Sequence, residues 1–223
     1  MKFEELKLKE KLIKSTTRLG FSVPTEIQEK CIPVILSGKD IVGKSQTGSG
    51  KTAAFGIPIL NKLEPRQGVQ AIILTPTREL CVQVYDNLKQ IGQYMKFRIV
   101  SVYGGVGIGP QIDALKTADI VVGTPGRVLD HLERKTLTLS NVKFFVLDEA
   151  DKMLEMGFID DIKKILKCTP QNKQSLMFSA TMPQQIKTIV NHHFKNPYII
   201  TRIRASSNTK NFTLERVNVL RSK

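Results

Sequence analysis

Short runs of apolar residues, rich in β-branched side chains, recur at fairly regular intervals along the chain. Most are nearly continuous in apolar character, which is typical of strands covered on both faces. The runs span residues 40–43, 69–75, 98–103, 119–123, 143–148, 174–179 and 198–203. Helical patterns lie between them, for example over residues 77–95 and 158–166. This alternation predicts an α/β fold, a doubly wound parallel sheet of about seven strands with helices on both faces.

The two ends of the chain differ from this middle part. Residues 1–38 precede the first strand, and their pattern predicts helices with a break at 20–24. Near the other end, residues 205–211 are small and polar, which is typical of a linker, and a strand-like pattern resumes over 212–220. That last stretch has two interpretations: it begins a unit that the chain does not finish, or it is an edge strand or a frayed tail.

Composition and charge narrow the function classes. With 41% hydrophobic and 24% charged residues the chain is neither disordered nor fibrous. No apolar run approaches the roughly 20 residues that span a bilayer, and the N-terminus has no secretory signal. The three cysteines are far apart and make no metal-ligand spacing, so we expect a reducing, cytoplasmic location. The net charge of +14 favours anionic partners, although a merely basic soluble protein has the same composition.

A glycine-rich segment at residues 41–52 predicts a phosphate-binding loop between a strand and a helix. Gly48 and Gly50 let the backbone curl so that several N–H groups point at one anion. The helix that begins near Lys51 adds its positive end. Lys51 would reach the β- and γ-phosphates, and the Thr52 hydroxyl would bind Mg²⁺. The alternative is a flexible Gly/Ser turn.

Two local features depart from the simplest form of this motif. Ser45 stands five residues before Gly50, where the usual pattern has glycine. Gly56 and Pro58 lie in the helix that should follow the loop, so we expect a kink or an early break there.

The buried run that ends at Asp148 is followed by further carboxylates. Acidic residues at the carboxyl end of a parallel strand lie where α/β proteins bind ligands. Asp148 would hold Mg²⁺ through water, and Glu149 could orient or deprotonate a water that attacks the γ-phosphate. The alternative interpretation is a solvated acidic helix start, with carboxylates favoured at the N-terminus.

Seven motifs in a fixed order resemble one known family. They are Gly-Phe-Ser-Val-Pro-Thr-Glu-Ile-Gln at 20–28, the glycine-rich loop, Pro-Thr-Arg-Glu-Leu at 76–80, Gly-Gly at 104–105, Thr-Pro-Gly-Arg at 124–127, Asp-Glu-Ala-Asp at 148–151 and Ser-Ala-Thr at 179–181. This set resembles the first RecA-like domain of the DEAD-box ATP-dependent RNA helicases over about residues 1–203. Ser45 is a mild departure, because many members have alanine there.

The resemblance implies an ATP site and divides the chain into three parts. Residues 1–38 would carry the adenine-recognition (Q) motif, 39–203 the RecA-like ATP-binding helicase domain 1, and 204–223 a linker and the start of an absent second RecA-like domain. Gln28 would read adenine, because its carboxamide matches the N7 acceptor and N6–H₂ donor, which favours ATP over GTP. The implied ATP-binding residues are Phe3, Phe21, Thr25, Gln28, Ser45, Gln46, Thr47, Gly48, Ser49, Gly50, Lys51 and Thr52. For Phe3 the alternative is an apolar anchor of the N-terminal helix.

The resemblance also implies RNA contacts and a coupling network. The RNA-backbone residues would be Pro76, Thr77, Arg78, Gly104, Gly105, Thr124, Pro125, Gly126 and Arg127. All three groups follow a predicted strand, so we expect them to share one rim of the sheet and to contact phosphate and sugar without reading bases. Ser179 and Thr181 face the same side of an extended segment, and their hydroxyls would bond Asp151.

The family needs a second RecA-like domain, whose arginines this sequence lacks. Loss of an arginine finger costs on the order of 10³–10⁵ in rate, so we expect this chain alone to be nearly inactive. We expect ATP and Mg²⁺ as cofactors, RNA as the partner, no membrane association and a monomeric chain. Two other hypotheses for the function remain: a small-molecule kinase or other phosphate-loop enzyme, and an ATP-independent RNA-binding module.

Overall fold

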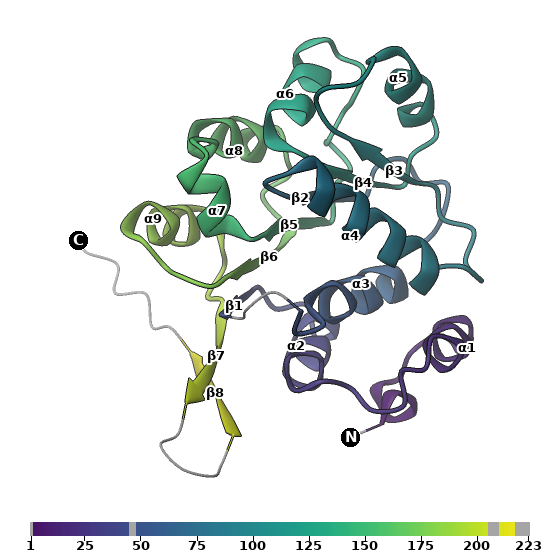
Figure 1. The fold of residues 1–223 in the computed structure, drawn as a ribbon, viewed down its shortest axis with the longest axis vertical. Coiled ribbons are helices and arrows are strands. Elements are labelled where there is room, and N and C mark those ends of the chain that lie inside the picture. Colours follow the sequence, from purple (N-terminus) through teal and green to yellow (C-terminus); the bar gives the residue numbers. More distant parts are fainter. Residues whose placement is uncertain (1, 45–47, 205–209, 217–223) are drawn as a thin grey trace.

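A parallel β-sheet covered by helices forms the centre of the computed structural model, which describes residues 2–44, 48–204 and 210–216 (Figure 1). Within these residues the strand order is β3-β4-β2-β5-β6-β1-β7-β8. The strands are β1 Ile41–Lys44, β2 Ala71–Leu74, β3 Ile99–Val102, β4 Ile120–Gly123, β5 Phe144–Asp148, β6 Gln174–Ser179, β7 Tyr198–Arg204 and β8 Lys210–Arg216. The first seven are all parallel, which confirms the predicted fold class.

The eighth strand is an addition at the edge of the sheet. β8 pairs antiparallel with β7 in the register Tyr198↔Arg216 to Arg204↔Lys210. For this stretch the structure matches the edge-strand interpretation. The assignment of residues 204–223 to a linker and a second domain stays a prediction, and 205–209 and 217–223 lie outside the described residues.

Helices occupy both faces of the sheet. The chain begins with a 3₁₀ turn, η1 Phe3–Leu6, followed by α1 Glu10–Arg18 and α2 Glu26–Leu36, with the expected break between the two helices. The other helices are α3 Lys51–Lys62, α4 Arg78–Ile91, α5 Gly109–Leu115, α6 Pro125–Glu133, α7 Ala150–Glu155, α8 Ile159–Lys167 and α9 Gln184–His193.

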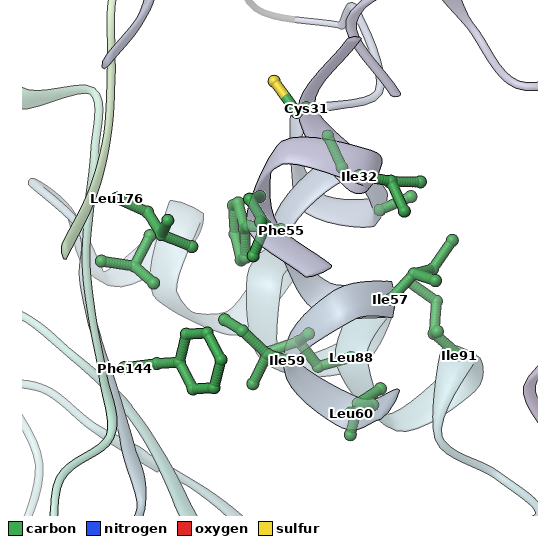
Figure 2. Close-up of a cluster of buried hydrophobic side chains, with 14 of the residues drawn as sticks. Cys31, Ile32, Phe55, Ile57, Ile59, Leu60, Leu88, Ile91, Phe144 and Leu176 are labelled. Carbon is green, nitrogen blue, oxygen red and sulfur yellow. The ribbon is translucent and has the colours of Figure 1, made fainter. Parts of the chain in front are cut away.

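Two apolar cores sandwich the sheet, because successive strand residues point to opposite faces. Phe144 and Val146 of β5 belong to the cluster formed with α1 to α4, and Phe145 and Leu147 belong to the cluster formed with α6 to α9. Figure 2 shows part of the first cluster, where α3 and α4 pack over the sheet. The nearly continuous apolar strands of the sequence follow from this double burial.

Of the two alternatives predicted for the helix after the phosphate loop, a kink or an early break, the early break is wrong. α3 continues through Gly56 and Pro58 to Lys62. A Cβ atom on Gly56 would lie 2.6 Å from Leu88 Cδ2 of α4, so the glycine permits close packing of the two helices. Every residue from 53 to 60 is buried, and this burial outweighs the local preference of glycine and proline to end a helix.

None of the described helices has the length and apolar character that crossing a membrane requires.

Gly123, which ends β4, provides a test of the sheet packing. An added Cβ would lie 2.5 Å from Val128 Cγ2 and 2.7 Å from Val102 Cγ2. We therefore expect Gly123→Ala to lower the free energy of unfolding by about 1–3 kcal/mol in urea unfolding, as overpacked core positions do. The matched control is Gly107→Ala, since no atom lies within 4 Å of its added Cβ. Equal stabilities of the two variants would contradict the packing described.

Candidate functional site

The segment between β1 and α3 places a helix N-terminus at the carboxyl edge of the sheet. Gly48 and Gly50 both have left-handed backbone, with φ of 79° and 88°, as the curled loop requires. Gly50 caps α3, so the first amides of the helix face the cavity described below. The predicted site residues Ser45, Gln46 and Thr47 lie outside the described residues.

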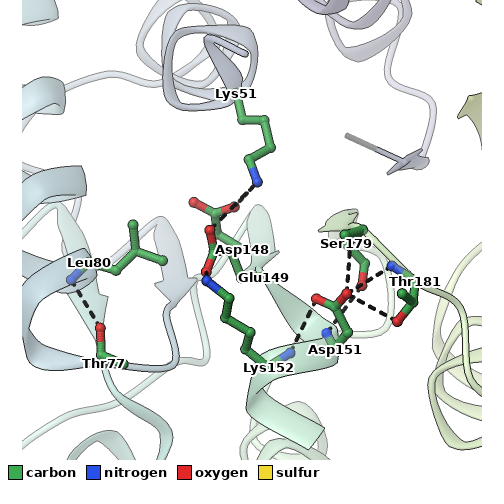
Figure 3. A network of polar contacts seen from close by, with 10 residues as sticks. Lys51, Thr77, Leu80, Asp148, Glu149, Asp151, Lys152, Ser179 and Thr181 are labelled. Atoms are coloured by element: carbon green, nitrogen blue, oxygen red, sulfur yellow. Dashed lines mark hydrogen bonds and ion pairs between the residues drawn. The ribbon is translucent and has the colours of Figure 1, made fainter. Parts of the chain in front are cut away.

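Lys51 is brought to the two acids at the end of β5. Its side chain is only 7% exposed, and its Nζ lies 3.8 Å from Asp148 Oδ1 and 3.9 Å from Glu149 Oε1 (Figure 3). The carboxyl ends of β1 and β5 share one edge of a parallel sheet, which is why these distant sequence positions meet. The glycine-rich loop and the acid pair, to which the sequence assigns the same γ-phosphate and Mg²⁺, therefore lie together.

Asp148 is buried and incompletely satisfied. Burial raises the pKa of Asp148 to about 6; Lys51 opposes this increase and the neighbouring Glu149 adds to it. Its Oδ1 atom has no hydrogen-bond partner among the described residues. A buried carboxylate oxygen without a donor favours a cation, so this atom fits a magnesium site.

Glu149 is held in an unusual backbone conformation and by a lysine. It caps α7 with φ 58° and ψ 53°, a left-handed geometry that is strained for a residue other than glycine. Its Oε2 lies 2.7 Å from Lys152 Nζ, and this hydrogen bond raises the pKa of Lys152. Sequence reasoning missed Lys152, although the spacing of three residues on a helix could have indicated the pair.

A cavity of about 420 Å³ joins these groups to the Q-motif segment. Residues from four parts of the chain line it, including Phe21, Thr25 and Gln28 on one side, Lys51 and Thr52 at the start of α3, Asp148 and Glu149 at β5, and Gln83, Asn87 and Gln90 along α4. The amide side chains of α4 were not predicted, because nothing in the local sequence distinguishes them from a solvated helix face.

Gln28 and Thr25 clamp the phosphate loop. Thr25 N donates to Gln28 Oε1 at 2.9 Å, and Gln28 Nε2 donates to the Gly50 carbonyl at 3.1 Å. Thr25 Oγ1 donates to the Ser49 carbonyl at 3.0 Å. One N–H and one lone pair of the Gln28 carboxamide remain for a ligand.

The two aromatic candidates occupy different positions. Phe21 lines the cavity, and Phe3 does not. Phe3 is 4% exposed and stacks on Phe21, with ring centroids 6.2 Å apart. In this structure Phe3 therefore acts as an apolar anchor behind Phe21, and its contact with a base stays a prediction.

Asp151 ties α7 to the segment after β6, as the sequence predicts. Its backbone N–H donates to Ser179 Oγ at 3.1 Å, and its Oδ2 accepts from Thr181 N at 2.8 Å and Thr181 Oγ1 at 3.1 Å (Figure 3). Partial burial raises the pKa of Asp151, but the hydrogen bonds from Thr181 and Ser179 outweigh it and hold the pKa below its usual value. The carboxylate is therefore charged and fixed in direction.

The predicted RNA-contact residues do share one rim of the sheet. Residues 76–78, 104–105 and 124–127 follow β2, β3 and β4, which are adjacent in the order β3-β4-β2. Thr77 caps α4 by accepting from Leu80 N at 3.2 Å (Figure 3), and Thr124 precedes α6 with Pro125 as its first residue. Two helix N-termini thus begin at this rim, where they favour negative charge.

The two arginines of the rim are held by neighbours that sequence reasoning missed. The Arg78 guanidinium lies 5.0 Å from the centre of the Tyr103 ring. Arg127 Nη2 donates to the Val106 carbonyl at 3.1 Å, while its buried Nη1 has no hydrogen-bond partner among the described residues. These pairs are distant in sequence, so no local pattern indicated them.

Within the part of the chain that the structure describes, no group of three or more His, Cys, Asp or Glu side chains could hold a metal ion. Asp148 and Thr52 supply at most two ligands. Such a site suits Mg²⁺ that arrives with a nucleotide, because Mg²⁺ keeps several waters and binds one or two protein oxygens together with phosphates.

Comparisons with known proteins find similar sequences. A family model described as DEAD/DEAH box helicase matches residues 25–189. The chain is similar to the ATP-dependent RNA helicase CshA of Listeria monocytogenes, 51% identical over 93% of this chain and 40% of the relative, and to the DEAD-box ATP-dependent RNA helicase CshA of Bacillus subtilis, 48% identical over 96% and 44%. The chain thus spans less than half the length of these curated relatives.

Solved structures are similar as well. The crystal structure of a DEAD box protein from Methanococcus jannaschii matches with a TM-score of 0.88 and 48% identity, over 90% of this chain and 56% of that one. A hypothetical ATP-dependent RNA helicase from Sulfolobus tokodaii matches with a TM-score of 0.81 and 44% identity, over 87% of this chain and 57% of that one.

The electrostatics of the acid pair can be measured directly. We expect Lys51→Met to raise the pKa of Asp148 above about 6, because the attraction of Lys51 favours the carboxylate. Carbon-detected NMR of labelled aspartates measures this pKa, with Lys163→Met as a distant control.

The raised pKa of Asp148 also makes the stability of the fold depend on pH. The pKa of Asp148 in the folded chain lies above its value of about 3.9 in the unfolded chain. Protonated Asp148 therefore stabilises the fold fully below pH ~3.9, and this contribution is lost as the pH rises through about 6. An unchanged or lower pKa in the Lys51 variant would contradict the assigned interaction.

Proposed function

This chain belongs to the DEAD/DEAH box helicase family, and we propose that it acts as the ATP-binding core domain of an RNA helicase. In this proposal it binds ATP and, together with a second RecA-like domain, hydrolyses it to unwind or remodel RNA. The observation that carries the proposal is the meeting of Lys51, Asp148 and Glu149 in one cavity with the N-terminus of α3.

In this proposal phosphate oxygens, and not the two acids, would be the nearest anionic partners of Lys51. Lys51 has two carboxylate neighbours at nearly 4 Å, a distance too long for a direct hydrogen bond. Charged phosphate oxygens at the start of α3 would give its ammonium shorter contacts and would also accept from the first helix amides. Thr52 and Asp148 would hold Mg²⁺, which neutralises charge on the phosphates.

Glu149 is the residue that we assign to the attacking water. Lys152 fixes one of its oxygens at 2.7 Å, and Glu149 lines the cavity. A carboxylate in this position can orient the water and accept its proton.

ATP selection would rest on Gln28. Its remaining N–H and lone pair match adenine, whereas guanine would place an acceptor opposite the Gln28 acceptor and leave both unpaired. The clamp between Gln28 and Gly50 would connect the presence of the base to the shape of the phosphate loop.

RNA would bind along the rim formed after β2, β3 and β4. Two helix N-termini, the glycine amides, the hydroxyls of Thr77 and Thr124, and the Arg78 and Arg127 side chains are groups that contact phosphate and sugar. The net charge of +14 supports such binding. We propose that binding is independent of base sequence and weakens steeply with salt.

We also propose a cytoplasmic location for the protein. Its three cysteines are free thiols, and Cys31 and Cys81 are buried, which raises the pKa of Cys81 to about 12. Buried neutral thiols of this kind fit a reducing compartment.

Substitution of the phosphate-loop lysine separates the helicase proposal from an ATP-independent RNA-binding module. We expect Lys51→Ala to weaken ATP binding by about 10- to 100-fold in calorimetry, because a charge-assisted contact with phosphate is lost. Lys187→Ala, an exposed lysine on α9, is the control. Unchanged ATP affinity in the Lys51 variant would exclude the proposed nucleotide site.

Glu149 has a test in the full-length protein that carries this chain and a second domain. Glu149→Gln should still bind ATP and RNA, yet RNA-stimulated ATP hydrolysis should fall by about 10²–10⁴-fold, because the general base is lost. Phosphate release measures this rate, and Glu10→Gln on the exposed side of α1 is the control. Normal turnover would remove Glu149 from its assigned role.

The contacts of Asp151 with Ser179 and Thr181 are tested by measuring how RNA changes the affinity for ATP. In the same full-length protein, Thr181→Val should leave ATP binding within about twofold but reduce the enhancement of ATP affinity by RNA about fivefold or more, a typical coupling energy. Thr188→Val, whose hydroxyl bonds only its own helix, is the matched control. Full enhancement in the Thr181 variant would show that its hydroxyl does not link the two sites.

A further inference from the structure

A second cavity lies at the opposite edge of the sheet from the nucleotide site. It has a volume of about 360 Å³ and is lined by lysines that come just before three adjacent strands: Lys39 before β1, Lys173 before β6 and Lys195 before β7. We propose that this lysine pocket binds a small phosphate-type anion, such as inorganic phosphate or pyrophosphate.

Lys173 is the strongest sign of a missing partner. The residue is only 7% exposed, and its Nζ donates to the Pro170 carbonyl at 3.2 Å. An ammonium has three donors, and the described residues offer Lys173 no carboxylate within ion-pair distance. A buried ammonium without a paired anion is costly, so the pocket is stabilised by any anion that reaches it.

The acid in the pocket is already engaged elsewhere. Asp40 lines the cavity, but its Oδ1 accepts from Ser175 N at 2.8 Å and its Oδ2 accepts from Lys195 N at 2.6 Å. Both oxygens therefore face backbone amides at the starts of the strands. With three lysines and one carboxylate the lining keeps a net positive charge.

The pKa values of basic groups around the pocket respond to this positive field. Burial lowers the pKa of His193, and the charges of Lys173 and Lys167 lower it further. Burial likewise lowers the pKa of Lys173, with Lys195 acting in the same direction and Asp40 against it. The side chains of Asn172 and Asn196 also line the cavity.

This donor set suits a phosphate group better than a carboxylate. Several ammonium groups and two amides supply more donors than one carboxylate can accept at good geometry, whereas phosphate has oxygens in every direction. The pocket is also independent of the nucleotide cavity, because the four residues of β1 separate the two by roughly 13 Å. A ligand here would leave Lys51 free to bind ATP.

The test uses NMR titration of the ¹⁵N-labelled chain with sodium pyrophosphate at constant ionic strength. All samples carry Lys51→Ala, so that the nucleotide site contributes little and a failure here says nothing about ATP binding. We expect saturable shifts of the Asn172 and Asn196 signals. The double variant Lys39→Gln/Lys195→Gln and the variant Lys173→Met should each weaken the affinity by about tenfold or more.

Lys187→Gln, an exposed lysine outside the pocket, is the matched control and should bind like the parent. If Lys173→Met does not fold, the variant Lys39→Gln/Lys195→Gln, which changes only exposed lysines, tests the proposal by itself. Shifts that do not saturate, or equal affinity in the double variant and the control, would overturn the proposal. Displacement of bound pyrophosphate by a short single-stranded RNA would assign the pocket to RNA phosphates and would overturn it equally.

Discussion

A lysine held between two buried carboxylates is the interaction on which the proposed site depends. Lys51 lies almost 4 Å from both Asp148 and Glu149, and all three side chains are nearly inaccessible to water. Buried charges at this separation attract strongly but are not satisfied by direct hydrogen bonds. A ligand that carries both phosphate and a cation would give Lys51 and Asp148 closer partners than they give each other.

Parallel strand topology explains why the remaining groups gather near this centre. Because every strand from β1 to β7 runs in the same direction, all their carboxyl ends open on one edge. The central strands β5, β6 and β1 bring the acids, the Ser179–Thr181 segment and the phosphate loop together. The neighbouring strands β2, β4 and β3 bring the rim residues. Asp151, fixed by Thr181, physically joins α7 to the segment after β6.

Much of this could be predicted from the sequence where the determining interactions are local. Continuous apolar strands, glycines before a helix and acids after a strand are local patterns, so the fold and the placing of the glycine-rich loop and the acid pair at one site could be predicted from them. The extension of α3 past Gly56 and Pro58 could not, because it depends on the burial of residues 53–60 against distant parts of the chain. The contacts of Arg78 with Tyr103 and of Arg127 with Val106 were not predicted either, because they join different loops. The ring contact between Phe3 and Phe21 was not predicted either, because the two residues belong to separate segments of the chain.

The backbone of Glu149 has a consequence for how such a domain can evolve. A left-handed conformation disfavours glutamate by about 1 kcal/mol or more relative to glycine, so a glycine here would make the fold more stable but would remove the proposed general base. Selection for heat tolerance and selection for turnover therefore pull in opposite directions at this one position. Lineages adapted to high temperature would have to recover the deficit elsewhere in the sheet while retaining the strained acid.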